Sequence, residues 1–205
     1  AVKFRRHGAG LRDRLLSSTD ALGKLAAIPV VAQTVNAVNK LPVARSLMQK
    51  TLGVHKERQL PEYASRKFRA GAAPSGAHAV KGGKNTPGKV AIFSTCYVNC
   101  NEPGLGHDLL ALLEHNELPY VLVEKEACCG MPKLELGDLA SVARLKEVNI
   151  PHLAKLAREG YAILTPVPSC TLMFKQELPL MFPGDAEVKA VQEAMFDPFE
   201  YFVLR

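Results

Sequence analysis

The sequence contains no tryptophan, and aromatic residues make up only 6% of its 205 residues. It also lacks a long apolar run. The longest uncharged stretch in its first half, the 15 residues between Lys24 and Lys40, is interrupted by four polar side chains. Since a membrane-spanning helix needs about 20 consecutive apolar residues, none is expected. The apolar share of 47% nevertheless excludes a wholly disordered chain.

No secretory leader precedes the five cysteines, and no two of them form a Cys-x-x-Cys pair. Without a signal for an oxidising compartment, we expect reduced thiols that take part in chemistry rather than structural disulfides. The chain starts at Ala1 without a methionine and ends inside an apolar pattern, so we interpret it as a piece of a longer protein.

Acidic residues are scarce in the first 89 positions, which hold 4 Asp and Glu against 17 Lys and Arg, whereas residues 90–205 hold 16 against 9. The two parts therefore have net charges of +13 and −7. This asymmetry predicts two physically different segments, the first of them suited to an anionic surface such as a phospholipid layer. Nucleic acid is not expected as a partner, because no binding motif and no interleaved aromatic residues accompany the basic charge.

Residues 1–69 are predicted to form a basic arm of short amphipathic helices. Its expected apolar stripes are Leu11, Leu15 and Leu16, followed by Val31, Val35 and Val38, with a helix cap at residues 18–20 between them. Pro29 and Pro42 suit the first turns of successive helices, where a missing backbone N–H leaves no hydrogen bond unmade. The stripes either pack on other protein or lie in the plane of a membrane surface, and the sequence leaves both readings open.

Residues 70–88 form a Gly-, Pro- and Ala-rich linker without apolar periodicity. Residues 89–205 are predicted to form an α/β domain, in which strands and helices alternate: a strand at 90–93, a helix around 105–113, a strand at 120–123, a helix over 139–160 and a strand at 161–164. This order predicts a short parallel sheet with crossover helices. The sequence does not place residues 171–205.

Finer features of the two helices can also be predicted. The first is expected to bury Leu105, Leu109, Leu112 and Leu113. The second is expected to pause and restart at Asn149 and Pro151, and to stop at Gly160.

Four of the five cysteines follow the predicted strands. Cys96 comes after the first strand, Cys128 and Cys129 after the second, and Cys170 after the third. Because the carboxyl ends of parallel strands lie at one edge of a sheet, we expect these thiols to converge there. Thiolates are the ligands that soft metals and iron–sulfur clusters require.

The cysteine spacing is itself distinctive. Cys96 is followed after 31 residues by Cys128, Cys129 and Gly130, and 40 residues separate Cys129 from Cys170. This spacing resembles the cysteine-rich CCG domain of heterodisulfide reductase catalytic subunits. Two longer runs extend the likeness, YVNCNEPGLG at 97–106 and EKEACCGMP at 124–132. Together they are most similar to the iron–sulfur oxidoreductases grouped with the iron–sulfur subunit of the anaerobic glycerol-3-phosphate dehydrogenase.

The resemblance implies that Cys96, Cys128, Cys129 and Cys170 bind an iron–sulfur cluster. The alternatives from the residues themselves are a single zinc ion, for which Cys-x-x-Cys pairs are missing, and a set of small buried apolar side chains. Cys100 is outside the family's ligand set and is interpreted as a packed thiol. The family pattern also ends in Cys-x-x-Cys, whereas only Cys170 is present here.

In function, the resemblance implies an electron-transfer subunit of a membrane-associated flavin dehydrogenase, which receives electrons from the flavin subunit and passes them toward quinone. Its expected location is cytoplasmic, peripheral on the inner face of the cell membrane. Family members often carry a second CCG repeat and a ferredoxin-like segment, neither of which is in this sequence, so the piece alone is expected to be inactive. A different class of function is a zinc-binding or scaffold module that tethers a partner enzyme to the membrane.

Overall fold

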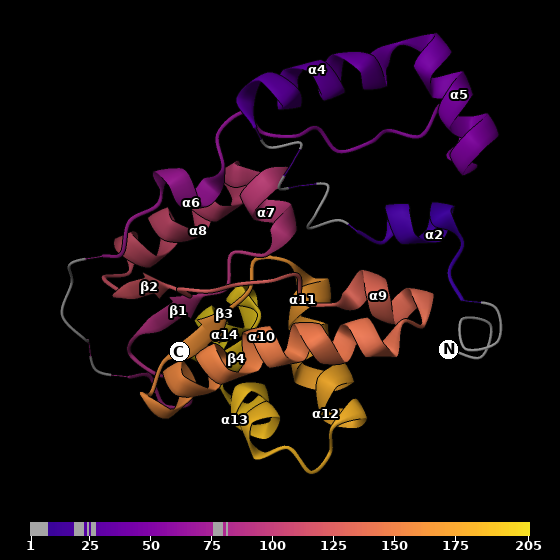
Figure 1. The fold of residues 1–205 in the computed structure, drawn as a ribbon. Helices are drawn as coiled ribbons and strands as arrows, with labels where there is room; N and C mark the ends of the chain where they lie inside the picture. Colours follow the sequence, from indigo (N-terminus) through magenta and orange to yellow (C-terminus); the bar gives the residue numbers. More distant parts are fainter. Residues whose placement is uncertain (1–7, 19–22, 24, 26–27, 76–79, 81) are drawn as a thin grey trace.

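A parallel sheet is the centre of the molecule (Figure 1). The computed structural model of the chain describes residues 8–18, 23, 25, 28–75, 80 and 82–205. Within these residues the sheet has four strands in the order β2-β1-β3-β4. The strands are β1 (Val90–Ile92), β2 (Tyr120–Leu122), β3 (Ala162–Leu164) and β4 (Met195–Phe196). Every neighbouring pair is parallel, so the predicted α/β fold is confirmed.

Helices connect the strands and cover both faces of the sheet (Figure 1). They are α7 (Cys96–Cys100), α8 (Pro103–His115), α9 (Met131–Leu136), α10 (Leu139–Arg158), α11 (Pro168–Leu172), the π-helical turn η1 (Met173–Glu177), α12 (Leu178–Met181), α13 (Ala186–Ala194) and α14 (Pro198–Leu204). The three strands predicted from the sequence are present within a residue of the expected positions, and β4 comes from the part that the sequence does not place.

Alternate residues of the strands build two separate hydrophobic cores. Ala91 and Ile163 point into a core with α10, α13 and η1, whereas Ile92 and Leu164 point into a core with α8 and α14. Both faces of the sheet are therefore buried, as a parallel sheet covered by crossover helices requires. Phe68, which precedes the sheet in sequence, is fully buried in the second core.

Two finer expectations about the helices are wrong. In α8, Leu105 and Leu112 are about half exposed, and Leu110 is buried instead. Because leucines occupy more than one side of α8, the sheet and not the periodicity selects the buried face. Helix α10 does not restart but runs through Pro151, and it ends as expected before Gly160, whose φ is 80°. Burial of α10 against the sheet outweighs the one backbone hydrogen bond that proline removes.

The N-terminal helices are α2 (Leu11–Leu16), α4 (Pro29–Lys40), α5 (Pro42–Leu52) and the short α6 (Phe68–Gly71). They lie on one side of the sheet domain, with α2 near α9 and α6 beside α8 (Figure 1). Pro29 and Pro42 begin α4 and α5 as predicted. The expected cap at residues 18–20 lies partly outside the described residues. In the described parts of the chain, no helix is long and apolar enough to cross a membrane.

Hydrogen bonds fix this arm to the sheet domain. The Ala64 N–H donates to the Cys100 carbonyl at 2.8 Å, and the Asn101 side chain donates to the Glu62 carbonyl at 2.8 Å. On the other side, the Lys133 ammonium donates to the Ser17 hydroxyl at 3.0 Å. The division into arm, linker and domain stays a prediction, but these contacts show that the arm packs on the domain.

The packing of α6 against α8 predicts the effect of one methyl group. A Cβ at Gly106 would lie 2.5 Å from Cδ2 of the buried Phe68 ring, whereas nothing lies within 4 Å of a Cβ at Gly104 in the same helix. Gly106→Ala is expected to lower the free energy of unfolding by about 1–3 kcal/mol through overpacking. Gly104→Ala should leave it unchanged or raise it, because alanine favours helix. Urea unfolding of both variants checks this, and equal effects would contradict it.

Candidate functional site

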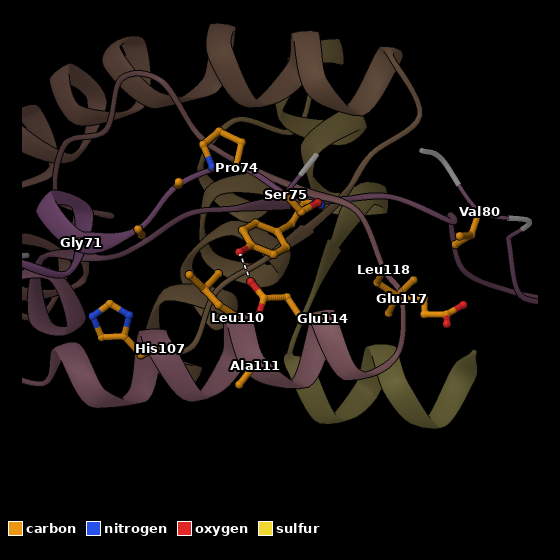
Figure 2. Close-up of a pocket in the computed structure, with 13 residues that line it drawn as sticks. Gly71, Pro74, Ser75, Val80, His107, Leu110, Ala111, Glu114, Glu117 and Leu118 are labelled. Atoms are coloured by element: carbon orange, nitrogen blue, oxygen red, sulfur yellow. Dashed lines mark hydrogen bonds between the residues drawn. The ribbon is translucent and has the colours of Figure 1, made fainter. Parts of the chain in front are cut away.

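A cavity of about 920 Å³ lies beside α8 and β2, away from the cysteines (Figure 2). Its polar side chains include the exposed His107 and the pair Tyr120–Glu114, in which the Tyr120 hydroxyl donates at 2.7 Å. Burial, together with this hydrogen bond, raises the pKa of Tyr120 to about 12. Among the described residues no group of three metal-ligating side chains is found there, and the cavity contains no thiol, so the cysteines are the better candidates for redox chemistry.

Cys96 is placed by a sharp turn after β1. Thr95 adopts φ 64°, an uncommon value for a β-branched residue, and its hydroxyl accepts a hydrogen bond from the Val98 N–H at 3.2 Å. This contact caps α7, whose first residue is Cys96. The turn thereby fixes the direction of the Cys96 side chain relative to the end of the strand.

Cys128 and Cys129 lie in the loop that follows β2. The next residue, Gly130, has φ 101°, a left-handed conformation that glycine adopts without strain. A Cβ there would approach the Met173 side chain to 3.5 Å. The glycine after the two cysteines therefore allows the loop to turn sharply into α9.

Glu126 holds this loop against the end of β1. Its buried carboxylate accepts hydrogen bonds from the Ser94 N–H at 2.9 Å and the Ser94 hydroxyl at 3.0 Å, and it pairs with the Arg69 guanidinium at 2.6 Å. Burial raises the pKa of the Glu126 carboxyl to about 6, although the Ser94 and Arg69 contacts oppose the rise. The segment before Cys128 is thus tied to the segment before Cys96.

Asn149 of α10 holds the same loop from the opposite side. Its side-chain oxygen accepts from the Ala127 N–H at 2.8 Å, and its amide donates to the Cys128 carbonyl at 3.1 Å. Neither Asn149 nor Glu126 is predicted as a site residue from the sequence. A polar residue on the apolar face of a long helix could have marked Asn149 as a candidate site residue. Because Pro151 lies close by, however, the sequence also suits a helix break at this position.

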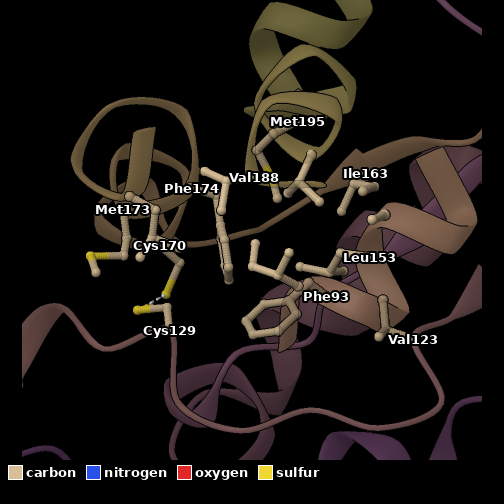
Figure 3. Packing of buried hydrophobic residues seen from close by; sticks show 14 of the residues in the cluster. Phe93, Val123, Cys129, Leu153, Ile163, Cys170, Met173, Phe174, Val188 and Met195 are labelled. Carbon is tan, nitrogen blue, oxygen red and sulfur yellow. Dashed lines mark hydrogen bonds between the residues drawn. The ribbon is translucent and has the colours of Figure 1, made fainter. Parts of the chain in front are cut away.

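The four predicted cysteines line one cavity of about 600 Å³. Cys128, Cys129 and Cys170 are buried, Cys96 is half-buried, and the Cys170 thiol donates to the Cys129 sulfur at 3.2 Å (Figure 3). The expected convergence at the carboxyl edge of the sheet therefore occurs. The fifth cysteine, Cys100, is buried on α7 and does not line this cavity; it lines a second one of about 300 Å³, to which Cys96 and Cys128 also contribute. The assignment of the four as ligands stays a prediction.

The chemistry of these thiols suits a metal-containing group. Hydrogen bonds to Cys128 and Cys170, followed by burial, raise the pKa of the Cys129 thiol well above its ordinary value. Closely packed thiols keep their protons because neighbouring thiolates would repel one another. A cationic centre removes this repulsion and replaces the protons, so the chemistry of this donor set suits an iron–sulfur cluster.

A single zinc ion fits less well. Within the described residues, no three His, Cys, Asp or Glu side chains are arranged to hold one metal ion. The zinc alternative thus gains no support from the geometry.

Comparison with known proteins gives a consistent result. Residues 90–175 match the family of the cysteine-rich domain CCG. The chain is 28% identical over 170 residues to a subunit, designated C, of the anaerobic glycerol-3-phosphate dehydrogenase of Escherichia coli (strain K12), with 82% of this chain and 41% of that protein covered. No solved structure matches the chain significantly.

Lactate utilization protein A is a second kind of relative. The protein of Geobacillus sp. (strain WCH70) is 30% identical over 109 residues, covering 53% of this chain and 44% of that protein. The protein of Anoxybacillus flavithermus (strain DSM 21510 / WK1) is 32% identical over 108 residues, covering 53% and 43%. The chain thus spans less than half the length of these relatives.

The raised pKa of Glu126 predicts a pH dependence of stability. The Glu126 carboxyl binds its proton more tightly in the folded state than in the unfolded state. The protonated carboxyl therefore contributes fully to the free energy of unfolding below pH 4.5, and this contribution is lost as the pH rises through 6. The loss is about 2 kcal/mol. The difference in unfolding free energy between the wild-type protein and Glu126→Gln should therefore fall by that amount between pH 4.5 and 7.

Urea unfolding at several pH values measures this difference. Glu124→Gln, an exposed position in the same loop, controls for the loss of a negative charge. A difference between wild type and Glu126→Gln that does not change with pH would contradict the prediction.

Proposed function

From the match of residues 90–175 to the family of the cysteine-rich domain CCG, we propose that the chain is an iron–sulfur electron-transfer subunit of a membrane-associated flavin dehydrogenase. In this role it receives electrons from a flavin-containing partner and passes them toward quinone. The observation that carries the proposal is the meeting of four thiols, from the ends of three neighbouring strands, in one cavity.

Each part of the site has a task in this function. Cys96, Cys128, Cys129 and Cys170 would hold the cluster, which supplies reversible one-electron transfer when bound. Glu126 and Asn149 act as positioning residues, because they fix the loop that carries two of the four thiols. The arm covers the cavity and limits the access of water to the thiols.

The partners follow from the similarity to dehydrogenase and lactate utilization proteins. A flavin dehydrogenase subunit is the proposed electron donor. A second CCG repeat and a ferredoxin-like segment, expected elsewhere in the same protein, would complete the path, so the 205-residue piece alone is proposed to be inactive.

Iron content tests the site directly. Cys170→Ser or Cys128→Ser in the intact protein, purified anaerobically, should lower bound iron and acid-labile sulfide several-fold, because the cluster loses a thiolate ligand. Cys100→Ser is the matched control and should change iron little, since Cys100 does not line the one cavity in which all four proposed ligands meet. An iron content equal to that of the wild-type protein in both Cys170→Ser and Cys128→Ser would contradict the proposal.

The arm supplies the proposed membrane contact. Val43 and Leu47 of α5 are 81% and 60% exposed, and Lys50 follows them on the same side of the helix at the spacing of three and four residues. Apolar side chains flanked by basic residues suit the surface of an anionic lipid layer. Val35, part of the stripe expected from the sequence, instead lines the cysteine cavity. The proposed location is the inner face of the cell membrane.

Liposome binding should therefore depend on the outer face of α5. Val43→Glu and Leu47→Glu are expected to reduce co-sedimentation with anionic vesicles, and high salt should weaken binding of the unchanged protein, because each basic residue contributes roughly 1 kcal/mol. Gln49→Glu, exposed on a neighbouring side of α5, introduces the same charge and should have a smaller effect. Sedimentation that is absent, or insensitive to lipid charge and to all three variants, would rule out this contact.

A further inference from the structure

We propose that a cavity in the basic arm binds the phosphate group of a small anionic ester. The cavity has a volume of about 420 Å³, within the range of small-molecule sites. It lies between the end of α4, the buried side of α5 and residues 56–62, which run back beside α4 (Figure 1). None of the five cysteines lines it, so the proposal does not depend on whether a cluster is bound.

The observation that carries the proposal is a buried cation without an acidic partner. Arg45 of α5 is 8% exposed, and its guanidinium donates hydrogen bonds to the backbone carbonyls of His55, Lys56 and Arg58. These acceptors are uncharged, and no carboxylate in the described part of the chain pairs with Arg45. Because a buried charge is costly unless an opposite charge offsets it, an anion in the adjacent cavity would stabilise this side chain.

The other charges around the cavity also favour an anion. The lining includes four basic and two acidic side chains, which are Lys40, Arg45, Lys56, Arg58, Glu57 and Glu62. Glu62 is already paired with Lys40 at 2.7 Å. Lys56 and Arg58 are exposed, and neither forms an ion pair with another described residue. The net charge of the lining is therefore +2, which attracts an anionic ligand.

Phosphate oxygens match these donors. Among the described residues, the three hydrogen bonds of Arg45 use Nε and Nη2 and leave Nη1 without an acceptor. A guanidinium binds phosphate through parallel N–H bonds, and lysine adds a compact positive charge. The amides of Asn39 and Gln59, which also line the cavity, can bind hydroxyl groups in the rest of the ester.

The walls of the cavity are held in place by the protein itself. The Asn36 side chain donates to the Tyr63 carbonyl at 2.8 Å and accepts from the Tyr63 N–H at 2.9 Å. The Gln49 side chain accepts from the Lys56 N–H at 3.0 Å. A ligand that enters a preformed site loses little free energy to ordering, which favours binding.

The orientation of α5 favours a soluble ester over a lipid headgroup. Residues two positions apart are separated by about 200° around a helix, so Arg45 lies opposite Val43 and Leu47. Val43 and Leu47 are exposed, whereas Arg45 is buried. The cavity therefore faces away from the surface proposed to meet the membrane.

Titration of the intact protein with inorganic phosphate at constant ionic strength, followed by the phosphorus NMR linewidth, tests the site. We expect saturable binding that the double substitution of Lys56→Gln with Arg58→Gln weakens at least ~10-fold, because two charge-assisted contacts are lost. Glu57→Gln should instead tighten binding about 3-fold, since it removes a negative charge from the lining. Arg66→Gln, at an exposed position of the arm outside the cavity, is the matched control and should leave binding unchanged.

Lys56, Glu57 and Arg58 are exposed, and Arg45 contacts only backbone carbonyls in this segment, so these variants should fold. Circular dichroism checks this. Binding that does not saturate, or that these variants change no more than Arg66→Gln does, would overturn the site. Because the measurement requires no iron, its result is separate from that of the iron analysis that tests the proposed function.

Vesicles of phosphatidylcholine with phosphatidic acid, a lipid phosphate monoester, distinguish the source of the phosphate. For a soluble ester, the double substitution should lower co-sedimentation with these vesicles no more than Arg66→Gln does. A larger loss, together with weaker binding of inorganic phosphate, would support the phosphate site and identify a lipid headgroup as its ligand.

Discussion

β1 lies between β2 and β3 in the sheet, so the chain leaves three neighbouring parallel strands at the same edge. The winding of the chain reverses at β1, since β2 is added on one side and β3 on the other. Crossover helices diverge at such a point and leave a crevice outside the strand ends. Each strand end is followed by at least one cysteine, and this strand order is what turns thiols that are distant in sequence into one group.

Strand order alone does not fix the conformation of the loop that carries Cys128 and Cys129. Polar contacts hold this loop in place. Glu126 contacts Ser94 and Arg69, and Asn149 accepts a hydrogen bond from the Ala127 N–H and donates one to the Cys128 carbonyl. Ser94 and Asn149 are buried, and only 11% of the Glu126 side chain is exposed. A buried polar group is costly unless its hydrogen bonds are made. The loop with two cysteines is consequently held by contacts that are lost together if it moves, which favours one well-defined arrangement of the thiols.

The arm has two sides with different tasks. Its inner side, with Val35 and Met48, closes the cavity above the cysteines, and its outer side carries Val43, Leu47 and Lys50. The charge asymmetry seen in the sequence belongs to this arm, whereas the acidic part is the sheet domain. Membrane contact, a covered redox site and a phosphate-binding cavity are therefore proposed for adjacent surfaces of the same few helices.

Features that depend on neighbours along the chain could be predicted from the sequence. Short apolar runs predicted three strands, Pro29 and Pro42 marked helix starts, and the positions of Cys96 and Cys170 after strands predicted their convergence. These signals are readable because strand and helix periodicity, and the order of strands and turns, are local properties.

Which polar and apolar side chains meet is set by the tertiary structure alone. Arg69 and Glu126 are 57 residues apart in the chain, and nothing local marks them as a pair. The buried face of α8, the inward direction of Val35 and the double hydrogen bond of Asn149 likewise depend on elements distant in sequence. The physical reason is that burial and hydrogen-bond pairing are properties of the assembled chain. A periodic pattern fixes where a side chain lies around its helix or strand, but not which side is buried or which partner it meets.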